Sequence, residues 1–282
     1  MGVSDWTRFS NPGHLVSITP FPFSVAGSRL TMSMPSTESA FANRTSNSLE
    51  VHLLGMLDFD SALFLQERLL YDIAGREDTL DSLLICEHPP LITVGREGSR
   101  SQILPDPDEL ESRQLDVRWI GRGGPAVMHS QGQLAVYPIL PLDRLDIGLS
   151  VFRRLLEDAV IDVCNDLKIK AWRDSQHPGV WCRSGRIATI GASVKRWVSH
   201  QGLFVNVAPD PDLARLVRYP GPDSRVSSFA AEPGRRNSMH SIRSGLIHHL
   251  AGLFHYADYH LYTGHPLLKR TKQRVYDYAA HH

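Results

Sequence analysis

Residues 122–140 read RGGPAVMHSQGQLAVYPIL and join a glycine-containing loop to an apolar strand. Gly123 and Gly124 follow a predicted strand at 117–120, and glycines in such a place let the backbone approach a ligand and present its N–H groups. A tight turn is the simpler explanation, because isolated glycine motifs are weak signals. Residues 134–140 predict a further strand, in which Pro138 indicates an edge or a bulge.

Short apolar runs bounded by turn residues predict further strands on both sides of this stretch, at 49–54, 83–86, 91–96, 180–182, 187–190 and 203–207. Apolar residues at helical spacing predict helices after Asp58 or Asp60, after Ser150 and after Asn237 or Ser238, with a last short helix after Pro266. Strands dominate the middle of the chain, while helices lie early, centrally and late. This order predicts an α+β or mixed α/β fold, a mixed sheet with packed helices.

The composition is that of a folded globular protein. Among its 282 residues, 42% are hydrophobic and 21% charged. Lys plus Arg equals Asp plus Glu at 30 each, so no global field attracts nucleic acid or an anionic membrane. No apolar run reaches the ~18 residues that a membrane span needs. We therefore expect neither nucleic acid nor a membrane as a partner.

The chain divides into three expected regions. Residues 1–48 are rich in Ser, Thr, Pro and Asn, and we expect a poorly ordered N-terminal extension without a secretory signal. Residues 49–262 are expected to form the folded domain, and 263–282 a C-terminal helix or tail. The three cysteines have no paired spacing, and the C-terminal histidines lack accompanying ligands, so we expect a reducing cytoplasmic location and no metal site.

Four further segments carry chemically suggestive residues in a fixed order. They are Glu87-His88-Pro89-Pro90, Pro178-Gly179-Val180, Arg186-Ile187-Ala188-Thr189-Ile190-Gly191 and Gly202-Leu203-Phe204-Val205-Asn206-Val207. With the segment at 122–133, they resemble the lipoyl(octanoyl) transferase family, whose members carry E-H-P-P, R-G-G-x-x-x-x-H-x-x-G-Q, P-G-V, K-I-A-x-I-G and H-G-L-x-x-N-V in this order. The resemblance covers roughly residues 50–230.

The resemblance implies a single domain of the biotin/lipoate protein ligase-like fold. It also implies transfer of an octanoyl group from octanoyl-acyl carrier protein to a lysine of a lipoyl domain, without a cofactor. The residues that match the family's acyl pocket are Arg122, Gly123, Gly124, Pro125, Ala126, Val127, Met128, His129, Thr189, Ile190, Gly191, Gly202, Leu203 and Phe204. Burial of an acyl chain there would contribute ~0.8 kcal/mol per methylene. His129 and His200 match family histidines, either as acid-base groups or as structural donors.

The sequence departs from the family at its two catalytic positions. The family's nucleophilic cysteine lies in a P-C-G turn, and counting without gaps from Gly202 places Pro220 there, flanked by Tyr219 and Gly221. The family's lysine position holds Arg186, which stays protonated and cannot serve as a base near neutral pH. Cys182 is a fallback nucleophile, because a nearby cation such as Arg186 would lower its pKa.

Three functions follow as expectations. The first is octanoyl transfer, through another nucleophile or by direct aminolysis of the thioester. The second is a catalytically inactive paralogue that binds acyl groups, the carrier or lipoyl domains. The third is an ATP-dependent lipoate or octanoate ligase, which needs no cysteine.

Overall fold

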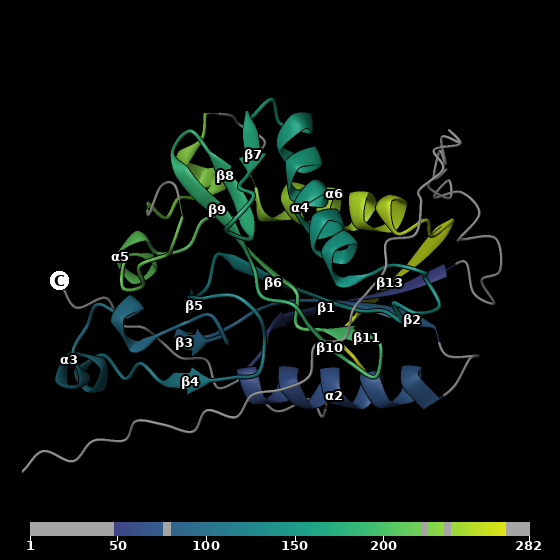
Figure 1. Ribbon diagram of the computed structural model, residues 1–282, viewed down its shortest axis with the longest axis horizontal. Coiled ribbons are helices and arrows are strands. Elements are labelled where there is room, and N and C mark those ends of the chain that lie inside the picture. The colour runs from purple at the N-terminus through teal and green to yellow at the C-terminus, as the bar shows by residue number, and fades with distance from the viewer. Residues whose placement is uncertain (1–47, 76–79, 222–224, 234–237, 269–282) are drawn as a thin grey trace, which may run out of the picture. The chain divides into compact units, whose positions relative to one another are not determined.

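The computed structural model describes residues 48–75, 80–221, 225–233 and 238–268 (Figure 1). The expected N-terminal extension lies outside them except for Ser48, as does most of the expected C-terminal tail. The helices are α2 (Phe59–Gly75), α3 (Pro107–Ser112), α4 (Leu149–Asp166), α5 (Pro211–Ala214) and α6 (Met239–Leu253).

Thirteen strands are found among these residues. They are β1 (Ser48–Met56), β2 (Asp81–Glu87), β3 (Leu91–Val94), β4 (Val117–Trp119), β5 (Ala126–His129), β6 (Gln133–Ile139), β7 (Ala171–Arg173), β8 (Gly179–Cys182), β9 (Gly185–Ile190), β10 (Ser193–Lys195), β11 (Val198–His200), β12 (Leu203–Asn206) and β13 (Asp258–Thr263).

The main sheet is mixed, as the sequence predicts. Its eight strands run in the order β13-β1-β2-β6-β12-β9-β8-β7, and β1 is parallel to both β13 and β2 while the other pairs are antiparallel. A smaller sheet has the order β4-β3-β5, and β10 and β11 form a separate hairpin. The predicted mixed α/β class is therefore confirmed.

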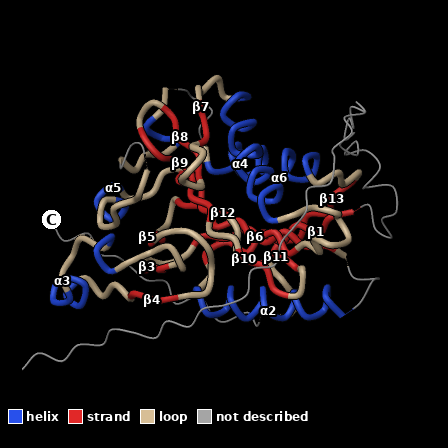
Figure 2. Tube along the Cα trace, viewed as in Figure 1, coloured by secondary structure: helices blue, strands red, loops and turns tan. Residues whose placement is uncertain are grey.

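Helices cover both faces of the main sheet. Figure 2 shows α2 on one side of the strands and α4 with α6 on the other. Strand β2 explains this arrangement, because it is apolar on both faces. Leu83 and Ile85 point into the core under α4 and α6, whereas Leu84 and Cys86 point into the core with α2 and the small sheet.

The helix starts follow ordinary capping rules. The Asp58 carboxylate accepts a hydrogen bond from Ser61 N at 2.8 Å, and Ser238 forms a capping box with Ser241. Both starts agree with the prediction. The predicted cap at Ser150 is wrong, because Gly148 is the N-cap of α4 and makes no side-chain bond.

Several elements differ from the prediction. The helix predicted to run through Ala257 is shorter, since α6 ends at Leu253; residues 254–257 form a turn, and strand β13 begins at Asp258. Residues 266–268 form a turn rather than the start of a helix. Strand β6 lies inside the sheet rather than at an edge. Its pairing with β12 stops at Val136, opposite Leu203, so Pro138 has no partner in β12. The missing N–H of Pro138 therefore removes no hydrogen bond between these two strands.

None of the helices in the described part of the chain is long and apolar enough to cross a membrane. The described residues likewise contain no group of three or more His, Cys, Asp or Glu side chains placed to hold a metal ion.

Candidate functional site

The three stretches predicted to line an acyl pocket lie together where strands β9 and β12 of the main sheet meet the loop that precedes β5. Strands β9 and β12 are paired, with Ile190 opposite Leu203. The turn after β9 is tied to β12 by the bond from Gly191 N to Gly202 O at 2.7 Å. The loop before β5 joins them, because Gly123 N donates to Ala192 O at 2.9 Å. The sequence-predicted juxtaposition is therefore present.

Side chains fill the space between these stretches. A Cβ atom on Gly191 would lie 2.9 Å from Phe204 Cε2 and 3.0 Å from Arg122 Cδ. The guanidinium of Arg122 lies over the Phe204 ring at 5.4 Å from its centroid, and both side chains are buried. The open glycine-lined slot expected from the sequence is occupied by this chain's own groups. The space that Gly191 leaves free is taken up by the side chains of Phe204 and Arg122 and is not an empty channel.

Arg122 is held as a buried cation. Its Nη2 donates to the carbonyl and the hydroxyl of Thr93, at 2.9 and 2.8 Å, and its Nη1 donates to Gly123 O at 2.8 Å. Burial lowers the pKa of Arg122 to about 10. The group therefore keeps its charge at neutral pH, and its bonds fix the loop that carries Gly123.

A chain of hydrogen bonds runs from Thr93 through the family motifs. Gln133 Nε2 donates to Met128 O and to Asn206 Oδ1, both at 2.9 Å, which leaves Gln133 Oε1 to accept from His129 Nδ1 at 2.9 Å. His129 Nε2 must then accept from the Thr93 hydroxyl at 2.8 Å. Both ring nitrogens are engaged, so the geometry favours the structural role for His129.

The second histidine of the family pattern, His200, lies on β11. Its Nδ1 is buried and makes no hydrogen bond with the described residues. Burial lowers the pKa of His200 below its ordinary value. Within the described residues, Nδ1 therefore has no partner with which it could exchange a proton.

Glu87 and His88 make structural hydrogen bonds next to the network that contains His129 and Gln133. Glu87 Oε2 accepts from Gly132 N at 2.7 Å, which fixes the turn between β5 and β6. His88 Nδ1 donates to Leu57 O and its Nε2 accepts from the Tyr137 hydroxyl, both at 2.7 Å. The imidazole is therefore neutral, and burial lowers the pKa of His88 to about 4.

Acidification is expected to destabilise the protein through His88 and His129. The pKa of His88 rises from about 4 when folded to its ordinary 6.5 when unfolded, so the unfolded chain binds more protons between these values. Burial also lowers the pKa of His129 well below its ordinary range. The free energy of unfolding should be highest above pH ~6.5 and fall by about 1.4 kcal/mol per pH unit for each histidine.

Urea unfolding at a series of pH values measures this slope. In the His88→Gln variant the free energy of unfolding should depend less steeply on pH, by up to the ~1.4 kcal/mol per pH unit that one proton contributes. A slope identical to that of the unsubstituted protein would contradict the assignment of His88 as a buried neutral group.

Arg186 and Pro220, the residues that the gap-free count assigns to the family's lysine and cysteine positions, are in direct contact. Arg186 Nη2 donates to Pro220 O at 2.5 Å, and its guanidinium stacks on Trp181 and Tyr219 at 4.5 and 5.1 Å from the ring centroids. Arg186 is 2% exposed, yet its Nε and Nη1 have no hydrogen-bond partner among the described residues. Burial lowers the pKa of Arg186 to about 10, so it stays charged. A buried cation with two unused N–H donors is a site for an oxygen acceptor.

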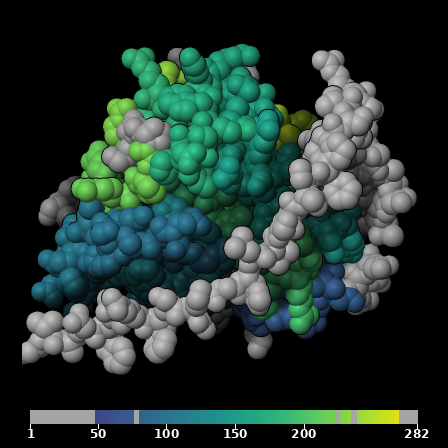
Figure 3. Space-filling model, in the orientation of Figure 1, coloured from purple at the N-terminus to yellow at the C-terminus, as the bar shows by residue number. Residues whose placement is uncertain are grey.

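The backbone that leads to Pro220 is bonded to residues 102 and 103, in the connection between β3 and α3. Ile103 and Val217 form an antiparallel bridge, and Arg218 N donates to Gln102 O at 2.7 Å. Figure 3 shows the adjoining surfaces of the α3–β4 segment and of the segment around α5. Pro220 itself supplies no nucleophile, so the contact with Arg186 lacks the family's thiol.

Cys182 is a buried donor. Its single S–H has two acceptors within reach, Glu232 Oε1 at 3.1 Å and Gly185 O at 3.4 Å, and the side chain is 1% exposed. Burial raises the pKa of the Cys182 thiol, so the expected lowering by Arg186 is wrong. These contacts disfavour the thiolate that a nucleophile requires.

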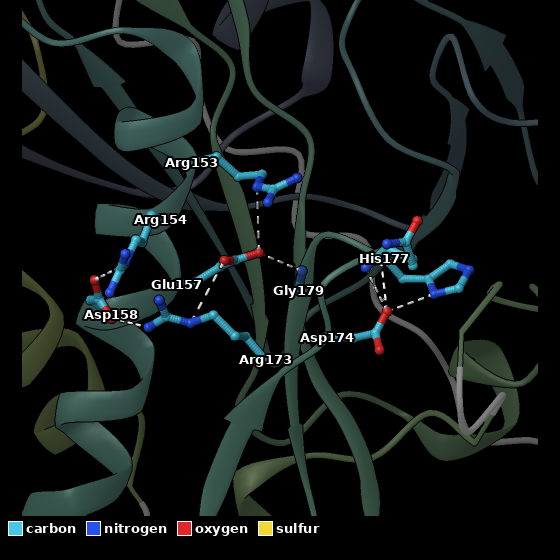
Figure 4. Close-up of polar contacts among 9 residues, drawn as sticks. Arg153, Arg154, Glu157, Asp158, Arg173, Asp174, His177 and Gly179 are labelled. Atoms are coloured by element: carbon cyan, nitrogen blue, oxygen red, sulfur yellow. Dashed lines mark hydrogen bonds and ion pairs between the residues drawn. The ribbon is translucent and has the colours of Figure 1, made fainter. Parts of the chain in front are cut away.

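A carboxylate that the sequence did not single out holds the Pro178-Gly179-Val180 segment. Figure 4 shows Glu157 of α4 between Arg153 and Arg173, with its Oε1 accepting from Gly179 N at 3.0 Å. Arg153 Nε and Arg173 Nε lie 4.0 and 3.9 Å from the carboxylate. The signal in the sequence was a glutamate beside the apolar stripe of the predicted helix. In the structure its carboxylate holds the turn at Gly179 through a charged hydrogen bond.

The sequence is similar to known proteins over most of its length. Residues 58–251 match the model of the lipoyl protein ligase A/B catalytic domain. An octanoyltransferase of Geotalea uraniireducens is 36% identical over 192 residues, covering 68% of this chain and 86% of the relative. One from Syntrophobacter fumaroxidans is 34% identical over 206 residues, covering 71% and 88%.

Solved structures match the fold. Lipoate-protein ligase A bound with ATP superposes with a TM-score of 0.58 at 18% identity, over 77% of this chain and 90% of that one. A putative lipoate protein ligase from T. acidophilum with bound lipoic acid gives 0.57 at 19% identity, over 77% and 90%.

Proposed function

Because the chain belongs to the lipoyl protein ligase A/B catalytic domain family, we propose that it transfers an octanoyl group from octanoyl-acyl carrier protein to a lysine of a lipoyl domain. The proposed unit is the octanoyltransferase-like domain of residues 49–262, acting in the cytoplasm. The observation that carries the proposal is Arg186, whose two unused donors lie beside the family's nucleophile position.

Arg186 is suited to hold the thioester carbonyl. Donors fixed in a buried place stabilise the oxyanion that develops when a carbonyl is attacked, and removal of one such donor costs about 10²–10³ in rate in other enzymes. With Pro220 in place of a thiol, the lysine amine attacks the thioester directly. Bringing the two substrates together supplies the proximity term that this route needs.

The proposed acyl pocket keeps the three stretches named from the sequence, residues 122–129, 189–191 and 202–204. Entry of an octanoyl chain requires the Phe204 ring or the Arg122 side chain to move, since both occupy the space beside Gly191. The burial of apolar methylenes supplies the driving force for that displacement.

The test combines the pure protein, octanoyl-acyl carrier protein and an apo lipoyl domain, with and without ATP, and follows the mass of the lipoyl domain. An octanoyl adduct without ATP is the expected result. An adduct that forms only with ATP and free octanoate would establish the ligase alternative instead.

Two observations favour a second candidate, an inactive paralogue that binds acyl groups, the carrier or lipoyl domains. The nucleophile position is Pro220 and the acyl space is filled by Arg122 and Phe204. This candidate would be supported if no adduct forms under either condition while the acyl carrier still binds.

The Cys182→Ser variant is expected to transfer at the rate of the unsubstituted protein. The thiol is buried and bonded to Glu232, so it does not reach a substrate. Initial rates of lipoyl-domain octanoylation measure this. A loss of transfer with an unchanged melting temperature would instead identify Cys182 as the nucleophile.

A further inference from the structure

Three side chains from different elements converge on Gly221, next to the family's nucleophile position. A Cβ placed on Gly221 would lie 3.1 Å from Trp181 Cζ2, 3.2 Å from Arg186 Nη2 and 3.7 Å from His177 Cγ. The first two belong to the contact already described. His177 lies in the loop between β7 and β8, outside every family motif in the sequence.

His177 is held in place by Asp174 (Figure 4). Asp174 Oδ1 accepts from the His177 ring Nδ1 at 2.8 Å, from His177 N at 2.8 Å and from Gln176 N at 3.0 Å. These bonds, that from the His177 ring first, lower the pKa of Asp174, so the carboxylate is charged. The bond to Nδ1 fixes the tautomer of a neutral imidazole, with the lone pair on Nε2.

The Nε2 atom of His177 makes no hydrogen bond with the described residues. The side chain is 37% exposed, so a substrate amine arriving from solvent can reach it. An imidazole oriented by a carboxylate and a guanidinium with unused donors approach the same glycine, Gly221. Together they are the parts that an acyl transfer needs: a proton acceptor and an oxyanion site.

We propose that His177, positioned by Asp174, is the catalytic base and acid of octanoyl transfer in this protein. The inference rests on the proposed function. It assigns to a histidine the proton transfers that the cysteine and lysine of the family pattern would otherwise share, and it assigns to Arg186 the carbonyl oxygen.

The steps balance as a direct aminolysis. The neutral amine of the lipoyl-domain lysine attacks the thioester carbon, forming the C–N bond and placing negative charge on the oxygen held by Arg186. His177 Nε2 takes one N–H proton. The C–S bond then breaks as the carbonyl re-forms, and His177 returns the proton to the leaving thiolate. The products are the amide and the free thiol of the carrier.

The experiment measures octanoylation of an apo lipoyl domain by the full chain. In the His177→Gln variant kcat should fall by about 100-fold or more, which is the usual contribution of general acid-base catalysis. The KM for octanoyl-acyl carrier protein should not change. His240→Gln, at an exposed histidine on α6, is the matched control and should transfer normally.

A His177→Ala variant separates chemistry from folding. Because the side chain is partly exposed, added imidazole should restore part of its lost rate. A His177→Gln rate equal to that of the unsubstituted protein would overturn the inference while leaving the proposed function intact, and so would a slow His177→Ala variant that imidazole does not restore. Absence of transfer by the unsubstituted protein would overturn both.

Discussion

The Gly202→Ala substitution is expected to lower the free energy of unfolding by about 3 kcal/mol or more. The added Cβ would lie 2.1 Å from Val136 O and 2.8 Å from Pro138 Cδ. Neither atom belongs to a flexible side chain, so β6 and β12 would have to separate. Thermal unfolding should report a fall in Tm of roughly 6–12 °C for a chain of this size.

Gly252→Ala is the matched control for this prediction. Gly252 lies in α6, and a Cβ there meets nothing within 4 Å. Alanine favours helix over glycine by about 1 kcal/mol, so this variant should be as stable as the unsubstituted protein or slightly more so. Equal stability of both variants would show that the strands adjust to the extra atom, against the close approach described here.

Thr93→Val is the second substitution with a large expected effect, a loss of about 3 kcal/mol in the free energy of unfolding. The Thr93 hydroxyl accepts from Arg122 and donates to His129 Nε2 in a place with no access to water. Valine keeps the shape but leaves a buried cation with one partner fewer and an imidazole nitrogen with none. Urea unfolding at pH 7 measures the loss.

Thr93→Ser separates the hydroxyl from the methyl group. Serine keeps both hydrogen bonds and removes one buried carbon, which costs about 1 kcal/mol. We expect the free energy of unfolding of Thr93→Val to lie well below that of Thr93→Ser. If serine is as destabilising as valine, packing rather than the hydrogen-bond chain holds this part of the core.

The fold could be predicted from sequence wherever apolar residues mark a buried strand or helix face. Strands such as β2 and β12 are apolar throughout, and α2 repeats buried residues at helical spacing. Strand β13 could not be found in this way, because all six of its residues are exposed. Backbone pairing with β1 holds it, and that pairing leaves no mark in the hydrophobic pattern.

The site could be predicted only in part. The motifs correctly brought residues 122–129, 189–191 and 202–204 together, and the Arg186–Pro220 contact supports the gap-free count. A glycine indicates that something approaches closely, but not whether it is a ligand or the chain itself. The Asp174–His177 pair was missed because it lies in a loop, where neither residue is part of a periodic pattern.

The pairing of β1 with β13 joins Ser48 to Asp258, which is made about 210 residues later. At a translation rate of ~5–20 residues per second, the ribosome synthesises β13 roughly 10–40 s after β1. During that interval β1 presents an unpaired edge of backbone N–H and C=O groups, the kind of surface that other strands add to. The nascent chain is therefore most exposed to aggregation, and most in need of a chaperone, before β13 is synthesised.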